Sequence, residues 1–244
     1  VMTAEWTHHA KDAAAPCEAC IHRTSCLPGT LEPATFQRFQ RLVQTHHFRE
    51  EGEVLFRTGA LAQYIYIVRT GSAKTKSIQY DGTEQVDGLY LPPDILGLDA
   101  LANGRYPNTG IVAEESSICA IRLSSLFALM SDTPDLQSTM MTAVSRALVQ
   151  REDLHRALSA THADTKVGYF LKYLSKRYRR IRQEWHEFRL PLQQQETASY
   201  LGLRKETVSR ALKGFQQRGC IEFQGREIRI VDAECLERFD EPGS

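Results

Sequence analysis

The sequence has no apolar run approaching the roughly 18 residues that a membrane-spanning helix needs, although 42% of its 244 residues are hydrophobic. Its opening residues, VMTAEWTHHAKDAAAP, lack the apolar core and small-residue cleavage site of a secretory signal. It also lacks internal repeats, low-complexity stretches, a paired nucleophile and base, and a phosphate-cradling loop. These absences disfavour a membrane protein, a secreted protein and an enzyme. We expect a cytoplasmic chain of one large or two ordinary domains.

Net charge is also absent, because 30 Lys and Arg balance 30 Asp and Glu. The balance hides an asymmetry: residues 161–231 contain 15 basic and 7 acidic side chains, an excess of eight positive charges. The remainder of the chain is correspondingly acidic. A basic end on an acidic body is typical of a separate module that binds a polyanion.

Residues 48–123 have the pattern of short β-strands separated by glycines. The apolar runs are VLF, YIYIV, AKTKSIQY, EQVDGLYL, TGIVA and SICAIRL, with glycines recurring between them. Regular short strands with glycine turns are typical of a β-sandwich or barrel. Before them, residues 33–44 place apolar side chains at helical spacing and predict a helix.

Residues 134–160 form one long helical pattern that opens at Pro134 and Asp135. Its apolar stripe is close to that of a coiled coil, so we expect the helix to pair with its copy in a homodimer. Arg151 lies in the stripe, where a charge is poorly placed in a monomer core but tolerable in a marginal dimer seam. The alternative is a helix packed on its own domain. The predicted seam comprises Met140, Val144, Ala147, Leu148, Arg151, Leu154 and Leu158.

The C-terminal part predicts a winged helix-turn-helix. Residues 193–201 and 204–218 have helical patterns on either side of Gly202, and the hairpin IEFQGREIRIV follows as a wing. The second helix of this motif enters the DNA major groove. An ordinary helix pair with a solvated charged face is the alternative, which the turn, the wing and the basic excess disfavour.

Three side chains of the second helix are expected to read bases. Glu206, Ser209 and Arg210 are spaced i, i+3 and i+4, so they share one face. Arg can bind guanine bidentately, and Glu can accept a hydrogen bond from cytosine N4. Contacts to phosphate, which carry no sequence information, are expected from Arg204, Lys205, Lys213 and Arg218.

Cysteines are few, six in all, but Cys17, Cys20 and Cys26 lie within ten residues. Three close thiols and a fourth ligand suit zinc, a [4Fe–4S] cluster or a redox disulfide switch. No second CxxC or HxxxH supports zinc, so spacing favours iron–sulfur only weakly. The fourth ligand could be Cys119, Cys220, Cys235 or a histidine. Cys220 and Cys235 are more simply interpreted as small hydrophobic residues.

The combination of CEAC-x5-C at residues 17–26, a lone Cys119 ending the β-region and ETVSR at residues 206–210 resembles the fumarate and nitrate reduction regulators of the cyclic-AMP receptor superfamily. The resemblance extends over nearly the whole chain. It implies an α+β fold: a β-roll (jelly-roll) sensory domain, a long dimerisation helix and a winged helix-turn-helix. The implied divisions are a Cys-rich segment at 1–30, the β-roll at 31–133, the dimerisation helix at 134–161 and the DNA-binding domain at 162–244.

The resemblance also implies an oxygen-labile [4Fe–4S] cluster on Cys17, Cys20, Cys26 and Cys119, one per subunit. It further implies a dimer that reads TTGAT half-sites of a palindrome through Glu206, Ser209 and Arg210, and so regulates anaerobic genes. A zinc- or thiol/disulfide-based redox regulator on the same scaffold is the alternative.

Two further expectations come from the same family. The cyclic-phosphate ligands of the nucleotide-binding branch are missing, because Leu98 follows Gly97 and Asn108 precedes Thr109; no cyclic nucleotide is therefore expected. RNA polymerase contacts are expected at Asp81, Gly82, Thr83 and Glu84, and at Glu115, Ser116, Ser117 and Ile118.

Overall fold

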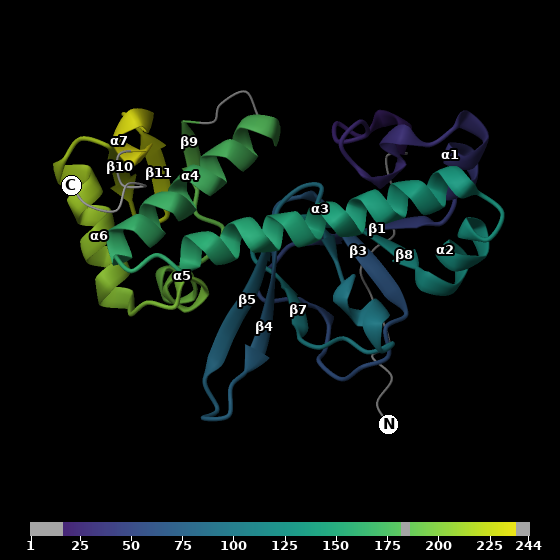
Figure 1. Ribbon diagram of the computed structural model, residues 1–244, viewed down its shortest axis with the longest axis horizontal. Coiled ribbons are helices and arrows are strands. Elements are labelled where there is room, and N and C mark those ends of the chain that lie inside the picture. Colours follow the sequence, from purple (N-terminus) through teal and green to yellow (C-terminus); the bar gives the residue numbers. More distant parts are fainter. Residues whose placement is uncertain (1–16, 182–185, 238–244) are drawn as a thin grey trace. The chain divides into compact units, whose positions relative to one another are not determined.

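The computed structural model describes residues 17–181 and 186–237 (Figure 1). Residues 1–16 of the predicted Cys-rich segment therefore lie outside the described residues. The chain divides into two compact units, Val1–Ser77 with Leu89–Leu148, and Ile78–Gly88 with Val149–Ser244. In the described ranges, no helix combines the length and the apolar composition that a membrane span requires.

Residues 43–122 form two antiparallel four-stranded sheets, as expected from the strand and glycine pattern; most of β5 (Glu84–Tyr90) belongs to the second unit and nearly all of the other strands to the first. One sheet has the order β1-β8-β3-β6 and the other β2-β7-β4-β5. Side chains from both sheets, including Phe48, Tyr66 and Phe56, form a shared buried core. The strands are β1 (Val43–Phe48), β2 (Val54–Phe56), β3 (Tyr64–Thr70), β4 (Ala73–Ile78), β5 (Glu84–Tyr90), β6 (Ile95–Leu96), β7 (Thr109–Val112) and β8 (Ser116–Arg122).

Strand β3 is buried on both faces, which explains its continuous apolar sequence. Successive strand side chains point to opposite faces. Tyr66 and Val68 enter the core between the sheets, whereas Ile65 and Ile67 enter a second core. That second core is closed by helices α1 (Pro33–Gln40), α2 (Leu123–Met130) and the start of α3 (Pro134–Leu158).

One sequence prediction in this unit was wrong at its end, and one helix was missed. The helix predicted over residues 33–44 ends at Gln40, and Val43 begins β1, which pairs with β8 from Val43↔Ile121 to Phe48↔Ser116. The hydrogen bonds of this ladder outweigh the weak helical tendency of VQ. Helix α2 follows β8 directly and was not predicted, because SICAIRL was read as strand to its end.

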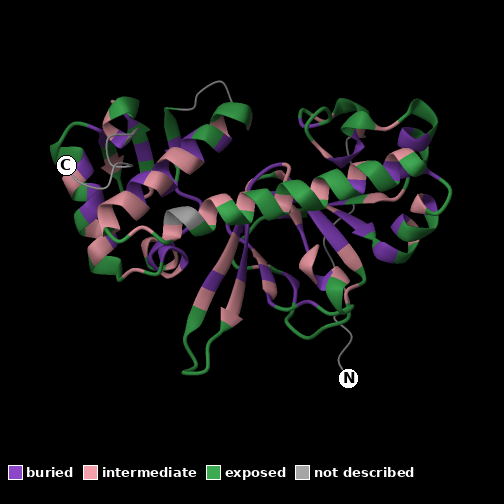
Figure 2. Ribbon diagram, in the orientation of Figure 1, coloured by how far each residue is buried: buried purple, intermediate pink, exposed green. Residues whose placement is uncertain are grey.

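Helix α3 begins at Pro134, as predicted, and is buried only at its start. Leu136 and Met140 are 0% and 4% exposed and belong to the second core of the first unit. Farther along, Val144 and Leu148 are 38% and 59% exposed, and Figure 2 shows exposed residues along most of the helix. An apolar helix face therefore remains open to solvent in the single chain.

The second unit contains the predicted helix-turn-helix and wing. Helix α4 precedes them, and its Gly168 lets Phe215 of α6 approach: a Cβ there would lie 3.1 Å from the Phe215 ring. The three-stranded sheet has the order β10-β11-β9. The elements are α4 (Ala163–Ile181), β9 (Glu187–Arg189), α5 (Gln194–Leu201), α6 (Lys205–Gln217), β10 (Ile221–Gln224), β11 (Glu227–Ile230) and α7 (Ala233–Glu237).

Candidate metal centre and nucleic-acid interface

The cysteine-rich segment is a succession of tight turns. It starts with the short helix η1 (Cys17–Ala19), and the Cys26 N–H donates to the His22 carbonyl at 2.8 Å. Helix η2 (Leu27–Thr30) follows at once. Gly29 is required there, because a Cβ would lie 2.6 Å from the Arg23 carbonyl oxygen. The turns hold three cysteines on one short stretch of backbone.

Cys119 lies in the middle of a sheet. Its strand, β8, pairs with β1 at Thr45 and with β3 at Ile67. The Thr45 hydroxyl and the Cys119 thiol are 3.7 Å apart and share a hydrogen bond. Cys119 is half-buried and packs on the second core of the first unit, beside Cys26. The rigid strand thus presents a thiol to the turns that carry the other three.

The four cysteines line one cavity of about 210 Å³. Cys17, Cys20, Cys26 and Cys119 are all free thiols. Within the part of the chain that the structure describes, no group of three or more His, Cys, Asp or Glu side chains is arranged to hold a single metal ion. The tertiary fold brings the four predicted ligands to one site without converging them on a point.

The cavity also contains polar groups that the sequence analysis did not single out. His22, Gln40 and Arg69 line it. The Gln40 Oε1 atom is buried and accepts no hydrogen bond from the described residues. Burial lowers the pKa of His22, which keeps the imidazole neutral. His22 could have been suspected from its place inside the cysteine motif, whereas nothing local distinguishes Arg69 on β3.

Burial and mutual proximity raise the pKa of three of these thiols, Cys17, Cys26 and Cys119. Burial, then the charges of Cys119 and Cys20, raise the pKa of Cys17 to about 11, against the pull of Arg69. Burial and the nearby Cys119 raise the pKa of Cys26 to about 12. Burial also raises the pKa of Cys119, which the hydrogen bond from Thr45 opposes. A metal that binds here must displace protons, so its affinity rises with pH.

In metal-free protein we expect iodoacetamide to alkylate Cys17 slowly. At about pH 8 a pKa of about 11 leaves roughly 100-fold less thiolate than the ordinary value of 9.0. The rate should increase about tenfold per pH unit toward pH 10, as followed by peptide mass spectrometry. Urea-denatured protein is the control and should react at ordinary rates. Fast alkylation of the folded protein at pH 8 would contradict the shift.

The same shifts predict how metal-free protein responds to alkali. The folded pKa values of Cys17 and Cys26, about 11 and about 12, lie above their ordinary value of 9.0. Their contribution to stability is therefore complete below about pH 9 and is lost as pH rises through 11 and 12. The cysteine-rich segment should loosen in that window, which hydrogen exchange of residues 17–30 can follow.

In the second unit, α5, the turn and α6 have the geometry of a helix-turn-helix. Gly202 ends α5 in the left-handed conformation, with φ 63° and ψ 39°, which glycine adopts without steric cost. The Leu203 N–H then donates to the Ala198 carbonyl at 2.9 Å. Helix α6 buries Val208, Leu212 and other apolar residues against the unit. Both helices are one or two residues shorter than predicted.

The predicted base-reading residues lie on the open face of α6. Glu206 and Arg210 are exposed and Ser209 is half-exposed. The Arg210 guanidinium donates to the Thr207 hydroxyl at 3.5 Å, within the same helix. Their spacing and exposure leave this face free to approach a base edge.

The predicted phosphate-contacting residues divide into two kinds. Arg204, Lys205 and Lys213 are exposed. Arg218, at the end of α6, instead stacks over the Phe215 ring at 4.9 Å and pairs with Asp164 at 3.6 Å. Its guanidinium helps to join α6 to α4 and is less free to contact DNA.

The two segments predicted to contact RNA polymerase differ in exposure. Asp81–Glu84 form an exposed hairpin turn, in which Asp81 accepts hydrogen bonds from the Thr83 N–H and hydroxyl at 2.9 and 2.6 Å. Residues 115–118 were expected to contact RNA polymerase from a loop, but most of them lie within a strand. Ser116, Ser117 and Ile118 are 3%, 4% and 0% exposed in β8, because sheet pairing and the core enclose them. Only Glu115 of that segment is exposed.

A second cysteine pair also departs from the prediction. Cys220 and Cys235 were read as separate small hydrophobic residues, but they form a disulfide. The C-terminal residues that carry Cys235 gave no local signal, so the pairing is visible only in the folded chain.

Comparisons with known proteins agree with this architecture. Residues 165–239 match the Crp-like helix-turn-helix domain and residues 47–133 the cyclic nucleotide-binding domain. The chain is 34% identical over 219 residues to the transcriptional activator protein FnrA of Stutzerimonas stutzeri, covering 90% of each. It is 30% identical over 220 residues to the fumarate and nitrate reduction regulatory protein of Escherichia coli K12, covering 90% of this chain and 88% of that protein.

Among solved structures, FixK2 from Bradyrhizobium japonicum is similar in fold. The TM-score is 0.73 at 24% identity, and the match covers 83% of this chain and 99% of that one. The predicted fold, a β-sheet domain of the cyclic nucleotide-binding type followed by a helix-turn-helix domain, is confirmed. The relatives are transcription factors, which confirms that the chain is not an enzyme. The chain is a DNA-binding transcription regulator and belongs to the CRP/FNR family.

Proposed function

We propose that this protein is an oxygen-responsive global regulator of anaerobic gene expression, located in the cytoplasm. Cys17, Cys20, Cys26 and Cys119 would hold one [4Fe–4S] cluster per subunit. The observation that carries the proposal is the single cavity lined by these four free thiols. The named relatives, activators of the FNR type, support the same function.

The residues of the cavity fit such a cluster. The four cysteine thiolates that hold a [4Fe–4S] cluster bind different iron atoms, so the sulfurs surround a volume rather than a point. A cavity of about 210 Å³ has room for a polynuclear group. Arg23, Arg41 and Arg69 also line it, and their charge offsets that of four thiolates. When bound, the cluster supplies an oxygen-reactive centre.

The cysteine segment contacts helix α3 directly, which provides a route from cavity to dimer. Leu27, next to Cys26, is buried with Leu136 and Met140. The Thr30 and Thr139 hydroxyls share a hydrogen bond of 3.0 Å. Release of the three cysteines would free the segment from β8 and disturb these contacts.

The residues that follow the cysteine segment also hydrogen-bond to the start of α3. Asp135 accepts hydrogen bonds from the Glu32 N–H at 3.1 Å and the Thr35 hydroxyl at 3.2 Å. Residues 27–35 therefore contact the first two turns of α3 through both apolar packing and hydrogen bonds. We propose that binding or loss of the cluster changes the position of α3 through these contacts.

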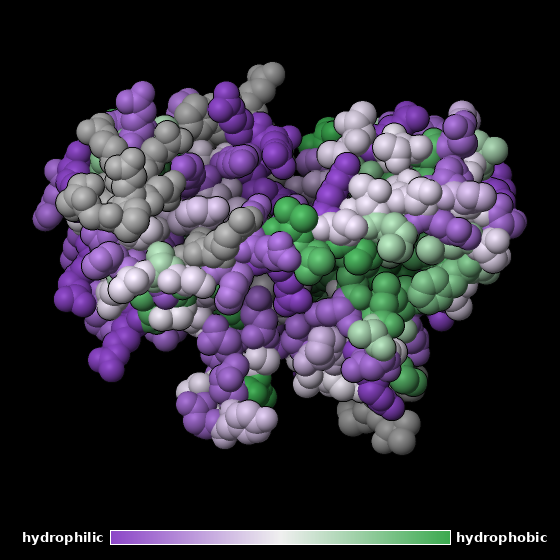
Figure 3. Space-filling model, in the orientation of Figure 1, coloured by the Kyte–Doolittle hydropathy of each residue, from purple (hydrophilic) through white to green (hydrophobic). Residues whose placement is uncertain are grey.

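We place the homodimer surface on the exposed stripe of α3. Met141, Val144 and Leu148 are 67%, 38% and 59% exposed, and Figure 3 shows hydrophobic side chains gathered on this face of the molecule. A second copy would cover them. The stripe continues through Ala147, Leu154 and Leu158, which are half-buried, and Arg151, which is exposed. Met140 belongs to the subunit's own core, so we leave it out of this surface.

Replacing Arg151 with alanine should tighten the dimer of cluster-free protein. The exposed guanidinium interrupts the apolar stripe, and burial of an unpaired charge opposes association. We expect the dissociation constant to fall about tenfold, a change of ~1.4 kcal/mol, in sedimentation equilibrium. Arg146→Ala, on another face of α3, is the matched control. An unchanged or weaker dimer would refute this role.

Dimerisation would place two copies of α6 about one helical turn of DNA apart, as a palindrome requires. We propose recognition of TTGAT-N4-ATCAA-like sites, with Arg210 on guanine, Glu206 on its paired cytosine and Ser209 beside them. Arg204, Lys205 and Lys213 would contact phosphates, with Arg218 a weaker contributor.

Two smaller proposals concern other ligands. Asp81–Glu84 and Glu115 would contact RNA polymerase, because they are the exposed members of the two predicted segments. The β-roll would not bind a cyclic nucleotide. The buried Asn108 donates to Asp99 at 3.5 Å, and that carboxylate would repel a cyclic phosphate.

Anaerobic purification tests the central proposal. We expect a brown protein with broad visible absorbance that air bleaches, containing about four iron and four labile sulfide per subunit. The bleached protein should be monomeric and bind the palindrome weakly. A colourless protein with stoichiometric zinc, or with no metal and unchanged DNA affinity in air, would overturn the proposal in favour of a zinc or thiol regulator.

A further inference from the structure

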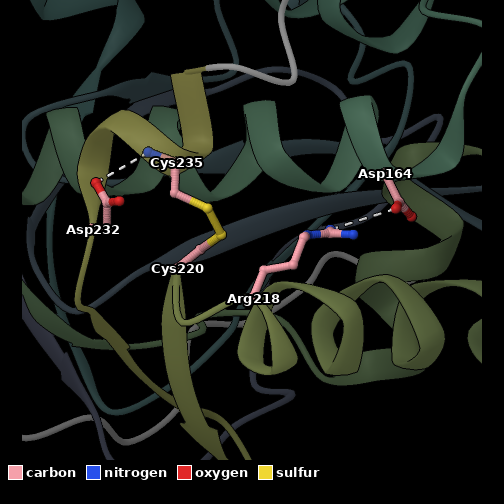
Figure 4. Close-up of a disulfide and its surroundings, with 5 residues drawn as sticks. All are labelled: Asp164, Arg218, Cys220, Asp232 and Cys235. Atoms are coloured by element: carbon pink, nitrogen blue, oxygen red, sulfur yellow. Dashed lines mark hydrogen bonds and ion pairs between the residues drawn. A yellow bond between two sulfur atoms is a disulfide. The ribbon is translucent and has the colours of Figure 1, made fainter. Parts of the chain in front are cut away.

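A second pair of cysteines lies in the DNA-binding unit. Cys220 immediately precedes β10, three residues after the end of α6, and Cys235 lies in α7. The two form a disulfide with a Cα–Cα distance of 5.4 Å (Figure 4), inside the usual range of about 4.4–6.8 Å. The bond closes a loop that contains the whole wing.

The backbone positions these two sulfurs independently of the bond between them. The Cys220 carbonyl accepts hydrogen bonds from the Val231 and Asp232 N–H groups, at 3.0 and 3.1 Å. Its own N–H donates to Phe215 at 2.9 Å, and the Cys235 N–H donates to the Asp232 carboxylate at 3.1 Å. Two thiols at these positions would remain adjacent after reduction, so the bond could form again without refolding.

The two cysteines differ in how far they are exposed to solvent. Cys220 is 0% exposed, whereas Cys235 is half-buried on a helix of only five residues. A reagent in solution therefore reaches Cys235 first. This arrangement suits a reactive thiol with a buried resolving partner.

We propose that Cys220 and Cys235 are a reversible redox pair, a second redox site separate from the four-cysteine cavity. The oxidant is a peroxide. The Cys235 thiol reduces hydrogen peroxide to one water and becomes a sulfenic acid. The Cys220 thiol then attacks that sulfur, forms the S–S bond and releases a second water. Two molecules of glutathione reverse the step: the first attacks the Cys235 sulfur, forms a mixed disulfide and releases the Cys220 thiol, and the second releases the Cys235 thiol and leaves as oxidised glutathione.

The bond has a consequence for the wing. It ties the strand that leaves the recognition helix α6 to α7, which packs on α4. Closure of a loop of this size restricts the unfolded chain. We expect the melting temperature of the oxidised DNA-binding unit to exceed that of the reduced one by roughly 5–10 °C. The oxidised protein should also bind DNA with a dissociation constant about threefold lower, because a wing that is already ordered loses less conformational entropy on binding.

Peptide mapping of the full chain tests the pair. Trypsin separates the two cysteines, because it cleaves after Arg218, Arg226, Arg229 and Arg238. Reduced protein is treated with one equivalent of hydrogen peroxide, trapped with N-ethylmaleimide and digested. We expect peptides 219–226 and 230–238 to be joined, and to separate again after glutathione. The four cavity cysteines lie in other tryptic peptides, so loss of a metal cluster does not change the masses of these two.

Cys235→Ser is the matched variant, because it leaves the buried Cys220 in place. Its melting temperature should be the same with and without peroxide, and its iron content should equal that of the wild type. Maleimide on both peptides after peroxide would overturn the proposal. So would a bond that persists in folded protein under strongly reducing glutathione, since the disulfide would then be permanent. Equal melting temperatures of the oxidised and reduced wild type would refute the effect on the wing.

Discussion

Replacing Cys119 with serine should remove bound iron and oxygen-dependent DNA binding together. Cys119 is the thiol that the β-roll contributes to the cavity, and the other three come from the turns at residues 17–26. Without it the proposed cluster would no longer join the cysteine segment to β8. We expect iron content to fall at least tenfold and anaerobic DNA affinity to approach that of air-treated wild type.

Two controls separate ligand loss from unfolding. Cys235→Ser removes a thiol from the other unit and should leave iron unchanged. Thr45→Val keeps the Cys119 thiol but removes the hydroxyl that hydrogen-bonds to it at 3.7 Å. Such outer partners typically change metal affinity by about 10–100-fold, so this variant should retain cluster with reduced stability in air. Full iron content in Cys119→Ser would contradict the proposed ligand set.

Replacing Arg210 with alanine should relax sequence preference as well as weaken binding. Arg210 is exposed on the open face of α6, and a bidentate Arg–guanine contact is worth about 1–3 kcal/mol of discrimination. That corresponds to roughly 5- to 150-fold per half-site. In fluorescence anisotropy, wild type should lose this amount when the G·C pair of TTGAT is changed, and Arg210→Ala should be nearly indifferent.

Lys213→Ala provides the contrast. Lys213 is exposed on the same helix but is assigned to phosphate, which carries no sequence information. We expect it to weaken all sites alike and to reduce the salt dependence of binding by about one ion per subunit. If both variants lost affinity uniformly, Arg210 would be a phosphate contact, and base reading would rest on other residues.

The helix-turn-helix shows where sequence reasoning succeeds. Its helices are defined by apolar spacing and by a glycine at the turn, both of which act over a few residues. Gly202 adopts the left-handed conformation that the turn requires, and the expected face of α6 is exposed. Only the helix ends differed, where capping and fraying decide a residue or two.

Strand β1 shows where local reasoning fails. Val43 was placed at the end of a helix, yet Val43–Phe48 pair with β8, about 70 residues later in the chain. The same limit affected Ser116–Ile118, which were expected to contact RNA polymerase by family analogy. Their burial depends on neighbours that no local pattern contains. Because Ser116, Ser117 and Ile118 are buried, they are not available for contact with RNA polymerase.

The sequence by itself determined the three-cysteine turn, the long apolar helix and the open face of α6, because each is encoded by spacing within one segment. Spacing left the fourth cysteine open and only the family resemblance pointed to Cys119; the tertiary structure placed it in the same cavity as those three cysteines and added Arg69 and Gln40 to its wall. It also joined Cys220 to Cys235. These associations depend on pairing and packing between distant segments, whose partners are selected only when the whole core forms.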